Sequence, residues 1–441
     1  MTDRAPALTP LDEPPDAPTA ELRRREHAWH STHRAEALWP GLDASIIQSA
    51  ADAIGVAVAA ILRGERASLR WDTAGADAER RTRALGVAAL VTGVGPLLGT
   101  WVEHGTFAVD EPIAPVLARH LAHGRARVSR IRAGVLPVLA RMHAEGLAPG
   151  VIKGFHTAYE YYPDPGARPT ADVDVVIAPP QVARAMDILR DAGFVSASAH
   201  VSGGKSEWTP PAADDRLWSH ELWHARAPWK LDLHDGLNFA AIMQVVRTHQ
   251  TAVLADVLHI DGVPLRVCDP NELIAVLATH GSTEIYQHRL LRLVELVLVV
   301  RRARSLERLD WDAVDASLAS RGTRRFAYPL LVLTERLAPG TVPAQVLARV
   351  RADTTRRIRD VTSRFTPTSP ILDERFSLSE RLLWASGPRA TTRRLWRMVS
   401  PLEGGPFGAR WVVLRHRALR LLSIVARTSR RGSAGRDDDA R

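Results

Sequence analysis

Two aspartates separated by one residue, Asp172 and Asp174, are the side chains whose type and spacing point most directly to chemistry. They lie in an apolar stretch, so we expect a strand. Because side chains alternate between the two faces of a strand, both carboxylates project from one side, about 7 Å apart. Such a pair repels itself unless a cation is near, and Mg²⁺, which prefers oxygen ligands, fits it. A solvated strand edge without an ion is the alternative that the spacing leaves open.

A second polar pair follows in residues 229–234. Asp232 and His234 are again two residues apart, so they share one face of the predicted strand, while Leu231 and Leu233 take the other. The predicted strand therefore offers a third carboxylate beside an imidazole. A polar sheet face that binds no metal remains the competing interpretation.

These segments belong to a longer pattern between residues 151 and 234. It comprises an apolar strand, an aromatic loop, a helix after the aspartate pair, and the residues Lys153, Gly154, Arg168, Asp172, Asp174, Asp232, Leu233 and His234. The pattern resembles the uncharacterised nucleotidyltransferase family of the polymerase-beta-like superfamily. The sequence departs from the superfamily pattern in two ways. Phe155 replaces the small residue after the glycine, and the gap from Gly154 to Asp172 is longer than the superfamily norm.

The resemblance implies a fold, a reaction and a set of site residues. The fold is α+β, with a small mixed sheet between large helical N- and C-terminal regions, and the reaction transfers a nucleotidyl group from a nucleoside triphosphate. Mg²⁺, or Mn²⁺, is the implied cofactor. The metal-binding and catalytic residues implied are Asp172, Asp174 and Asp232, and the nucleotide-binding residues are Lys153, Gly154, Arg168 and His234. A glycine lets phosphate approach the backbone, and an arginine fork suits paired oxygens.

The acceptor stays open, with a small molecule, a peptide natural product and a protein side chain all compatible with the pattern. No motif for sequence-specific nucleic-acid binding is present. Phe155 keeps a different class open, namely a binding protein that retains the fold without turnover. Residues 390–431 are basic and amphipathic, so contact with an anionic membrane surface is a further alternative to packing against the body of the protein.

Composition sets the broad limits. The chain has 441 residues, 46% of them hydrophobic and 24% charged, which is typical of a globular protein with more than one core. Its net charge of +9 comes almost entirely from arginine, since only residues 153, 205 and 230 are lysines. Cys268 is the only cysteine, which excludes an intrachain disulfide and favours the cytoplasm. The uncharged stretch 84–102 contains glycines and a proline, so we interpret it as a buried helix–turn–helix rather than a membrane span.

Periodicity and turn residues divide the chain into five parts. We predict a disordered tail over 1–20, a helical N-terminal domain over 35–146, the catalytic core over 147–268, a helical C-terminal domain over 269–425, and a disordered basic tail over 426–441. The last helix of the N-terminal domain contains Pro137, where a kink is expected.

Within the core we predict a glycine turn after strand 150–153, a helix over 180–192, a strand over 194–198 and a loop over 202–215. Strands over 217–226 and 229–234 follow, and then a hairpin over 257–268 that turns at Asp261 and Gly262. Asn271 is the expected cap of the next helix, and another helix runs from Glu284 to about Arg302. His280 and His288 lack the spacing of a zinc pair, so we interpret both as structural, with a substrate-facing position as the alternative.

Overall fold

The computed structural model describes residues 15–196, 205–211, 213–235, 254–283 and 290–369, together with residues 384, 389, 391 and 392. The helices are α1 (Thr19–Thr32), α2 (Ala35–Leu38), α3 (Ala44–Leu62), α4 (Ala78–Thr92), α5 (Gly95–Glu103), α6 (Ala114–Ala144), α7 (Lys153–Glu160), α8 (Val182–Asp191), α10 (Pro270–Thr283), α11 (Leu290–Ser305), α12 (Trp311–Ser320), α13 (Arg324–Leu337), α14 (Ala344–Ala352) and α15 (Arg356–Ser363).

A seven-stranded mixed sheet occupies the middle of the chain. Its strands are β3 (Gly150–Ile152), β4 (Asp172–Val176), β5 (Val195–Ser196), β6 (Lys205–Thr209), β7 (Lys230–His234), β8 (Asp256–Ile260) and β9 (Val263–Val267), in the order β5-β6-β7-β4-β3-β9-β8. A separate parallel pair joins β1 (Ala67–Ser68) to β2 (Phe107–Ala108). The predicted α+β architecture, a small mixed sheet among many helices, is confirmed.

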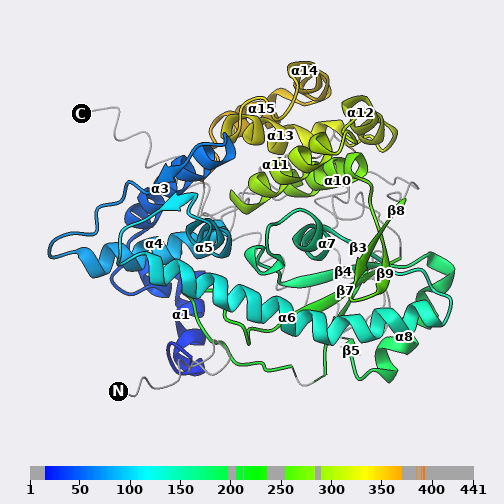
Figure 1. Cartoon of the computed structure of the whole chain (residues 1–441), viewed down its shortest axis with the longest axis horizontal. Coiled ribbons are helices and arrows are strands. Elements are labelled where there is room, and N and C mark those ends of the chain that lie inside the picture. The colour runs from blue at the N-terminus through cyan, green and yellow to red at the C-terminus, as the bar shows by residue number, and fades with distance from the viewer. Residues whose placement is uncertain are drawn as a thin grey trace.

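One face of the sheet is apolar and is covered by two helices. Val173, Val175, Leu231 and Leu233 alternate with the polar residues of β4 and β7, and all four are fully buried. They form one hydrophobic cluster with side chains of α6 and α8, including Ile131, Leu139 and Ile188. The long cyan helix α6 runs across the sheet toward α8 (Figure 1). The opposite face is therefore left for polar side chains.

The two helical regions share a second hydrophobic cluster. It contains residues of the N-terminal helices, such as Val58 and Leu97, and of the C-terminal helices, such as Val276 and Leu331. Helices α3, α4 and α5 accordingly lie near α11 and α13 (Figure 1). The domain boundaries given above stay a prediction.

The apolar stretch 84–102 forms α4 and α5, two helices that meet at 112°, with most of their side chains buried. Helix α3 also has the length and hydropathy of a spanning helix, and 44% of its most apolar window is buried; within the described ranges only α3 and the bent α4–α5 pair pass this test. Part of α3 is covered by the segment around Thr368. Gly55 of α3 leaves room for the Thr368 side chain, whose hydroxyl donates a hydrogen bond to Asp52 of the same helix at 2.5 Å.

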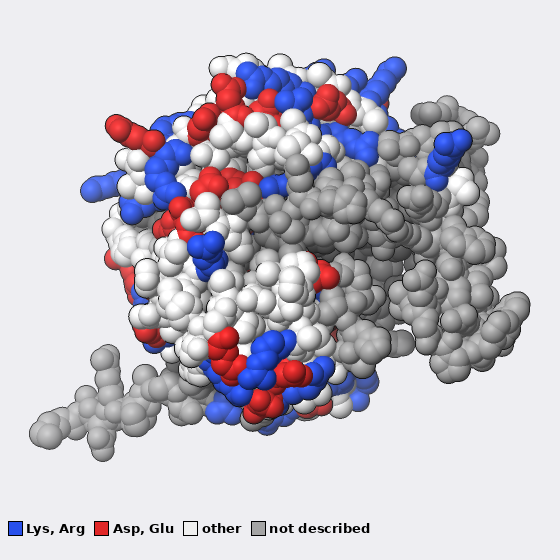
Figure 2. Space-filling view, turned by 90° about the vertical axis from the view of Figure 1, so that its right-hand side faces the viewer, with Lys and Arg blue, Asp and Glu red and all other residues white. Residues whose placement is uncertain are grey.

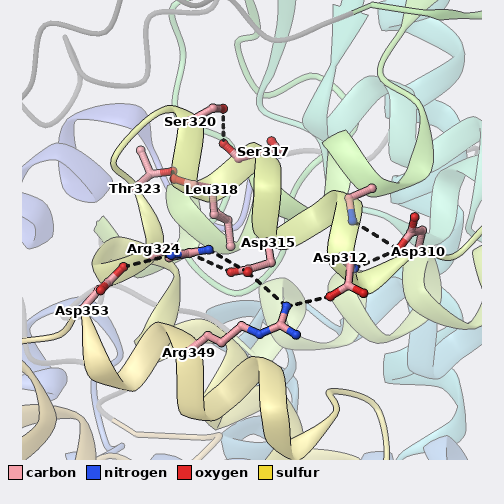
Figure 3. A network of polar contacts seen from close by, with 11 residues as sticks. Asp310, Asp312, Asp315, Ser317, Leu318, Ser320, Thr323, Arg324, Arg349 and Asp353 are labelled. Carbon is pink, nitrogen blue, oxygen red and sulfur yellow. Dashed lines mark hydrogen bonds and ion pairs between the residues drawn. The ribbon is translucent and has the colours of Figure 1, made fainter.

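Ion pairs tie the C-terminal helices together. Asp315 of α12 accepts two hydrogen bonds from Arg324 of α13, at 2.7 and 2.8 Å, and lies 3.2 Å from Arg349 of α14. Arg349 also binds Asp312, and Arg324 also lies 3.7 Å from Asp353 (Figure 3). The five residues thus connect three helices through forked arginine contacts.

The described part of the face in Figure 2 carries no concentration of basic side chains. In the described part of that face, basic and acidic side chains lie interspersed at the top and the bottom, and uncharged residues fill most of the area between them. This mixed surface gives no sign of an extended basic patch on that side.

The predicted strand over 217–226 is wrong. These residues are irregular, and their backbone groups find side-chain partners in place of a strand ladder. His123 of α6 accepts a hydrogen bond from the amide of Ala225, and Arg130 donates to the carbonyls of Arg226 and Ala227.

The predicted loop over 202–215 is also wrong in part, because residues 205–209 form β6. Its glycines and prolines flank a short stretch of alternating burial in which Ser206 and Trp208 are 1% exposed. The antiparallel ladder with β7 fixes this stretch as a strand. Of the strand expected over 194–198, Val195 and Ser196 form β5, Phe194 precedes the strand, and residues 197 and 198 lie outside the described residues.

The hairpin is confirmed, with β8 and β9 joined at Asp261 and Gly262, both at positive φ. The cap of α10 is not Asn271: Asp269 accepts hydrogen bonds from the amides of Asn271 and Glu272.

Helix α11 is described from Leu290 onward, and residues 284–289, which include His288, lie outside the described residues. Residues 1–14 of the tail predicted over 1–20, most of the basic segment 390–431 and the tail over 426–441 also lie outside the described residues. Thr19 and Ala20 belong to α1, so the predicted disorder is wrong for these two residues.

Arg127 of α6 binds the backbone just before both central strands, β4 and β7. Its guanidinium, 1% exposed, donates to the carbonyls of Thr170, just before β4, and of Ala227 and Pro228, just before β7. Arg127→Met leaves the carbonyls of Thr170 and Pro228 without these donors, while that of Ala227 keeps Arg130, so we expect the free energy of unfolding to fall by about 3 kcal/mol in urea denaturation. Arg130→Met is the matched control, since Arg130 contacts only the β7 side. Equal losses in the two variants would contradict this account.

Candidate active site

The carboxylate face, defined here as the sheet face that carries Asp172, Asp174 and Asp232, is set by strand register. Strands β4 and β7 are parallel neighbours, and Asp174 is the direct partner of Asp232. Asp172 pairs in the same way with Lys230. Because alternate residues share a face, the register brings all three predicted carboxylates together.

Asp174 is held by two cationic or protonatable groups. It is 6% exposed, and its Oδ1 lies 3.2 Å from Lys153 Nζ and 2.8 Å from His234 Nε2. Burial alone would raise the pKa of Asp174, but the Lys153 charge and the His234 hydrogen bond hold it below its usual range. Asp174 is therefore an anion at neutral pH.

Lys153 reaches this carboxylate through an unusual backbone conformation. It has φ +51°, in the left-handed region that non-glycine residues rarely adopt, at the point where β3 ends and α7 begins. The sequence predicted a glycine turn here. The structure instead starts a helix at Lys153, and the strained residue is the lysine rather than Gly154. Such strain at a buried charged side chain is typical of a functional site.

Asp232 is the most deeply buried of the three carboxylates, at 1% exposure. Its Oδ2 lies 2.6 Å from Lys205 Nζ, and Lys230 Nζ is 3.6 Å from its Oδ1. That Oδ1 has no hydrogen-bond partner among the described residues. Glu207 of β6 is the direct neighbour of Asp232 on the other side, so three carboxylates form a row across β6, β7 and β4.

Arg168 and Gly154 come together, but not around an open phosphate site. The guanidinium of Arg168 pairs with Glu295 of α11, with Nε 3.0 Å from Oε1, and it donates to the carbonyl of Pro169. A Cβ on Gly154 would lie 2.4 Å from Arg168 Nη1, so the glycine makes room for this arginine. Thr157 of α7 donates to the same Glu295 carboxylate. The prediction that Arg168 contacts phosphate stays untested, and its guanidinium has internal partners.

His280 of α10 lies on the same side of the sheet. Its Nδ1 is 3.2 Å from Arg292 Nη1, and burial, with the charges of Lys153 and Arg292, lowers its pKa well below the ordinary value. A neutral His280 adds no positive charge near Asp174. Five aromatic residues from the segments around the site, Tyr161, Tyr162, Trp208, Trp218 and Trp229, are each less than 9% exposed and pack in the interior.

The donor atoms of the carboxylate face suit a hard divalent ion. Carboxylate oxygens are the ligands that Mg²⁺ prefers, and the buried Oδ1 of Asp232 lacks a partner. Within the described ranges, no group of three or more His, Cys, Asp and Glu side chains is arranged closely enough to hold an ion as it stands. Oxygens of Asp174 and Asp232 face the ammonium groups of Lys153 and Lys205. The side chains match the ion chemically, and lysines neutralise them in this structure.

Three residues of this region were not assigned a role from the sequence. Lys205 and Glu207 lie in the segment interpreted as a loop, and Glu295 lies in a distant helix that no local pattern connects to Gly154. The scarcity of lysine was the one available signal. It drew attention to Lys153 and Lys230, and it applies equally to Lys205.

A small mixed sheet with paired aspartates on one strand and a third on its parallel neighbour defines the nucleotidyltransferase class. Comparison with family models matches residues 82–339 to a family described as "Uncharacterised nucleotidyltransferase". The match spans more than half of the 441 residues, so the chain belongs to this family, and the resemblance noted in the sequence is confirmed.

Other comparisons add little. The solution structure of the antibiotic-resistance factor ANT(2'')-Ia is similar over 44% of this chain and 93% of that chain, with 13% sequence identity and a TM-score of 0.30. A likeness of that size bears on neither fold nor substrate. No curated protein matches the chain.

The electrostatics of Asp172 give a testable consequence for stability. Burial, and then the charges of Asp174 and Asp232, raise the pKa of Asp172. Because the folded-state pKa is raised, Asp172 destabilises the fold increasingly as the pH rises above the unfolded-state pKa, and fully above the folded-state pKa. Well below the unfolded-state pKa both states are protonated and the effect vanishes. Asp172→Asn should therefore raise the melting temperature at pH 7 in EDTA, and the gain should shrink toward pH 3. Asp187→Asn, at an exposed position on α8, serves as the control; a lower melting temperature for Asp172→Asn at pH 7 would contradict the assignment.

Proposed function

We propose that this protein transfers a nucleotidyl group from a nucleoside triphosphate to an acceptor. The observation that carries the proposal is the register of β4 and β7, which sets Asp174 beside Asp232 on one sheet face in a member of a nucleotidyltransferase family. Three carboxylates converging from adjacent strands match what transfer at a phosphorus centre requires.

Asp172, Asp174 and Asp232 would hold Mg²⁺, or Mn²⁺. When bound, the ion supplies positive charge to the phosphate oxygens and favours ionisation of the acceptor hydroxyl. The chain itself must keep the three carboxylates charged and correctly oriented. Lys153 and His234 do this for Asp174, and Lys205 does it for Asp232.

In the proposed reaction the acceptor oxygen forms a bond to the α-phosphorus while the bond to the bridging oxygen breaks and pyrophosphate leaves. Asp232 takes the proton of the acceptor hydroxyl, as a buried carboxylate with an unpartnered oxygen can do. Lys153 and the start of α7 at Gly154 lie beside Asp174, where they would bind the triphosphate. Arg168 has an indirect role. It pairs with Glu295 and packs against Gly154, and in this way it helps to hold the start of α7 in place.

The acceptor class remains a small molecule, a peptide natural product or a protein side chain. A cytoplasmic location is part of the proposal and is supported only by the single cysteine, which is buried. We propose no sequence-specific nucleic-acid partner. A membrane-surface role for the basic segment 390–431 concerns residues that are almost all outside the described ranges.

A binding protein without turnover is the second reading, and Phe155 was the residue that favoured it. Phe155 is 1% exposed and packs in the hydrophobic cluster of the sheet, with its ring 5.0 Å from that of Tyr159. The packing of Phe155 from α7 into this cluster accounts for its large side chain. Phe155 therefore no longer favours a binding protein without turnover.

Turnover can be tested with triphosphates labelled at the α-phosphate, incubated with the protein, Mg²⁺ and cell extract as a source of acceptors. We expect transfer of label by the wild type and a loss of about 10²–10⁴-fold in rate for Asp232→Asn, because the proton acceptor is removed while the shape is kept. Asp256→Asn is the matched control, since Asp256 binds Arg308 at the far edge of the sheet. Equal transfer by wild type and Asp232→Asn would contradict the assigned role, and no transfer with any of the four triphosphates would favour the binding protein.

A further inference from the structure

All three lysines of the chain contact carboxylates of the candidate site. Of the 58 basic residues Lys and Arg, only Lys153, Lys205 and Lys230 are lysine. Lys153 binds Asp174, and Lys205 and Lys230 lie on either side of Asp232. Everywhere else the chain uses arginine, so the choice of lysine coincides with one site.

Lysine and arginine do different work in this protein. The static ion pairs use the arginine fork, as where Arg324 donates to both oxygens of Asp315 and Arg216 to both oxygens of Asp214. An ammonium group is a compact point charge whose three donors can exchange one oxygen for another. Lysine therefore suits a position where a carboxylate and a ligand oxygen must alternate.

Lys205 and Lys230 already hold a carboxylate oxygen between them. Glu207 Oε1 lies 3.3 Å from Lys205 Nζ and 2.7 Å from Lys230 Nζ. The two lysine side chains are 36% and 38% exposed and that of Glu207 is 51% exposed, so solvent reaches all three. Both lysines also contact Asp232, whose buried Oδ1 has no hydrogen-bond partner among the described residues. The contact shows which chemical group this pair recognises, namely an oxyanion.

The strand order decides which substrate these lysines face. Lys153 and Gly154 follow β3, on one side of the β4–β7 pair, whereas Lys205 and Glu207 lie on β6, on the other side. If the triphosphate lies by Lys153 and Gly154, as proposed above, the β6 side is left for the acceptor. This step rests on the proposed function.

We propose that the acceptor carries an oxyanion, a phosphate or a carboxylate, and that Lys205 and Lys230 bind it. With Asp232 engaged in the reaction, the two ammonium groups face only one remaining carboxylate, that of Glu207. The ligand oxyanion displaces Glu207 from the position between the lysines. Lys205 and Lys230 are thus specificity-determining residues for the acceptor, and Glu207 is their internal competitor.

The test uses inorganic phosphate and succinate as separate probes. Each is titrated by calorimetry into the full-length protein saturated with Mg²⁺ and a non-hydrolysable triphosphate analogue. We expect one of the two probes to bind with a dissociation constant in the millimolar range, and which one binds identifies the phosphate or carboxylate source. Spermidine, titrated in the same way, probes for a cationic acceptor.

The variants predict changes of opposite sign. Glu207→Gln removes the competitor and should tighten oxyanion binding, whereas Lys205→Gln/Lys230→Gln should weaken it about tenfold or more. Lys205→Arg/Lys230→Arg should keep part of the binding, since arginine supplies the charge but its fork holds Glu207 more firmly, and this partial retention separates lost charge from misfolding. Arg141→Gln is the control, with a cation of similar exposure that pairs with Glu145 and Asp191.

Each outcome has one meaning. No binding of phosphate or succinate to an analogue-loaded wild type, or binding that is unchanged in the Lys205→Gln/Lys230→Gln variant, overturns the inference. Spermidine binding that Glu207→Gln abolishes also overturns it and indicates a cationic acceptor. Failure of the wild type to bind any analogue contradicts the proposed function itself, which distinguishes the two failures.

Discussion

The side-by-side placement of Asp174 and Asp232 is the constraint on which the rest of the structure depends. Two buried carboxylates on neighbouring strands repel one another and lose hydration, so they persist only with positive charge close by. The chain supplies that charge from two different elements, since Lys153 comes from the start of α7 and Lys205 from the adjacent strand β6. His234 of β7 adds a hydrogen bond to Asp174.

The scaffold around this pair serves to fix its register. A one-residue slip of β7 would turn Asp232 toward the apolar cluster and Leu231 toward the carboxylate face. Hydrophobic packing of Leu231 and Leu233 against α6 and α8 opposes such a slip. Arg127 adds a polar constraint, because one guanidinium binds the backbone ahead of both β4 and β7.

The C-terminal helices contribute to the site as well as to the core. Glu295 of α11 binds Arg168 and Thr157, and the arginine in turn fills the space beside Gly154. This chain of contacts links α7 to a helix far along the sequence, since Glu295 follows Thr157 by 138 residues. The family match over residues 82–339 covers both ends of this chain of contacts, which fits a catalytic unit that includes helices on either side of the sheet.

Periodicity was enough to predict β4, β7, α8 and the β8–β9 hairpin, because each is a short element whose alternation or turn residues are local. The same local signals failed where side chains, rather than a neighbouring strand, supply the hydrogen-bond partners of the backbone. The segment 217–226 was predicted as a strand, yet its backbone at Ala225 and Arg226 is bound by the side chains of His123 and Arg130. β6 was missed because Gly203, Gly204, Pro210 and Pro211 on its flanks outweighed the alternation of Ser206 and Trp208.

The site could be predicted only as far as motif spacing reaches. Asp172, Asp174, Asp232, Lys153 and His234 were named from the sequence, and the structure brings them together on or beside one face. Arg168 was expected to face phosphate, but its partner Glu295 lies too far along the chain for any local pattern to reveal it. Glu207 depends on the pairing of β6 with β7, which no spacing within one segment encodes.

The central claim, that Asp172 and Asp174 form the nucleotide site, is tested most directly by calorimetry. The four nucleoside triphosphates would be titrated into the wild type and into Asp172→Ala/Asp174→Ala, each with Mg²⁺ and with EDTA. We predict that at least one triphosphate binds the wild type only when Mg²⁺ is present and that the double variant loses this binding. Equal binding by the two proteins would contradict the claim, because the nucleotide site would then lie away from β4.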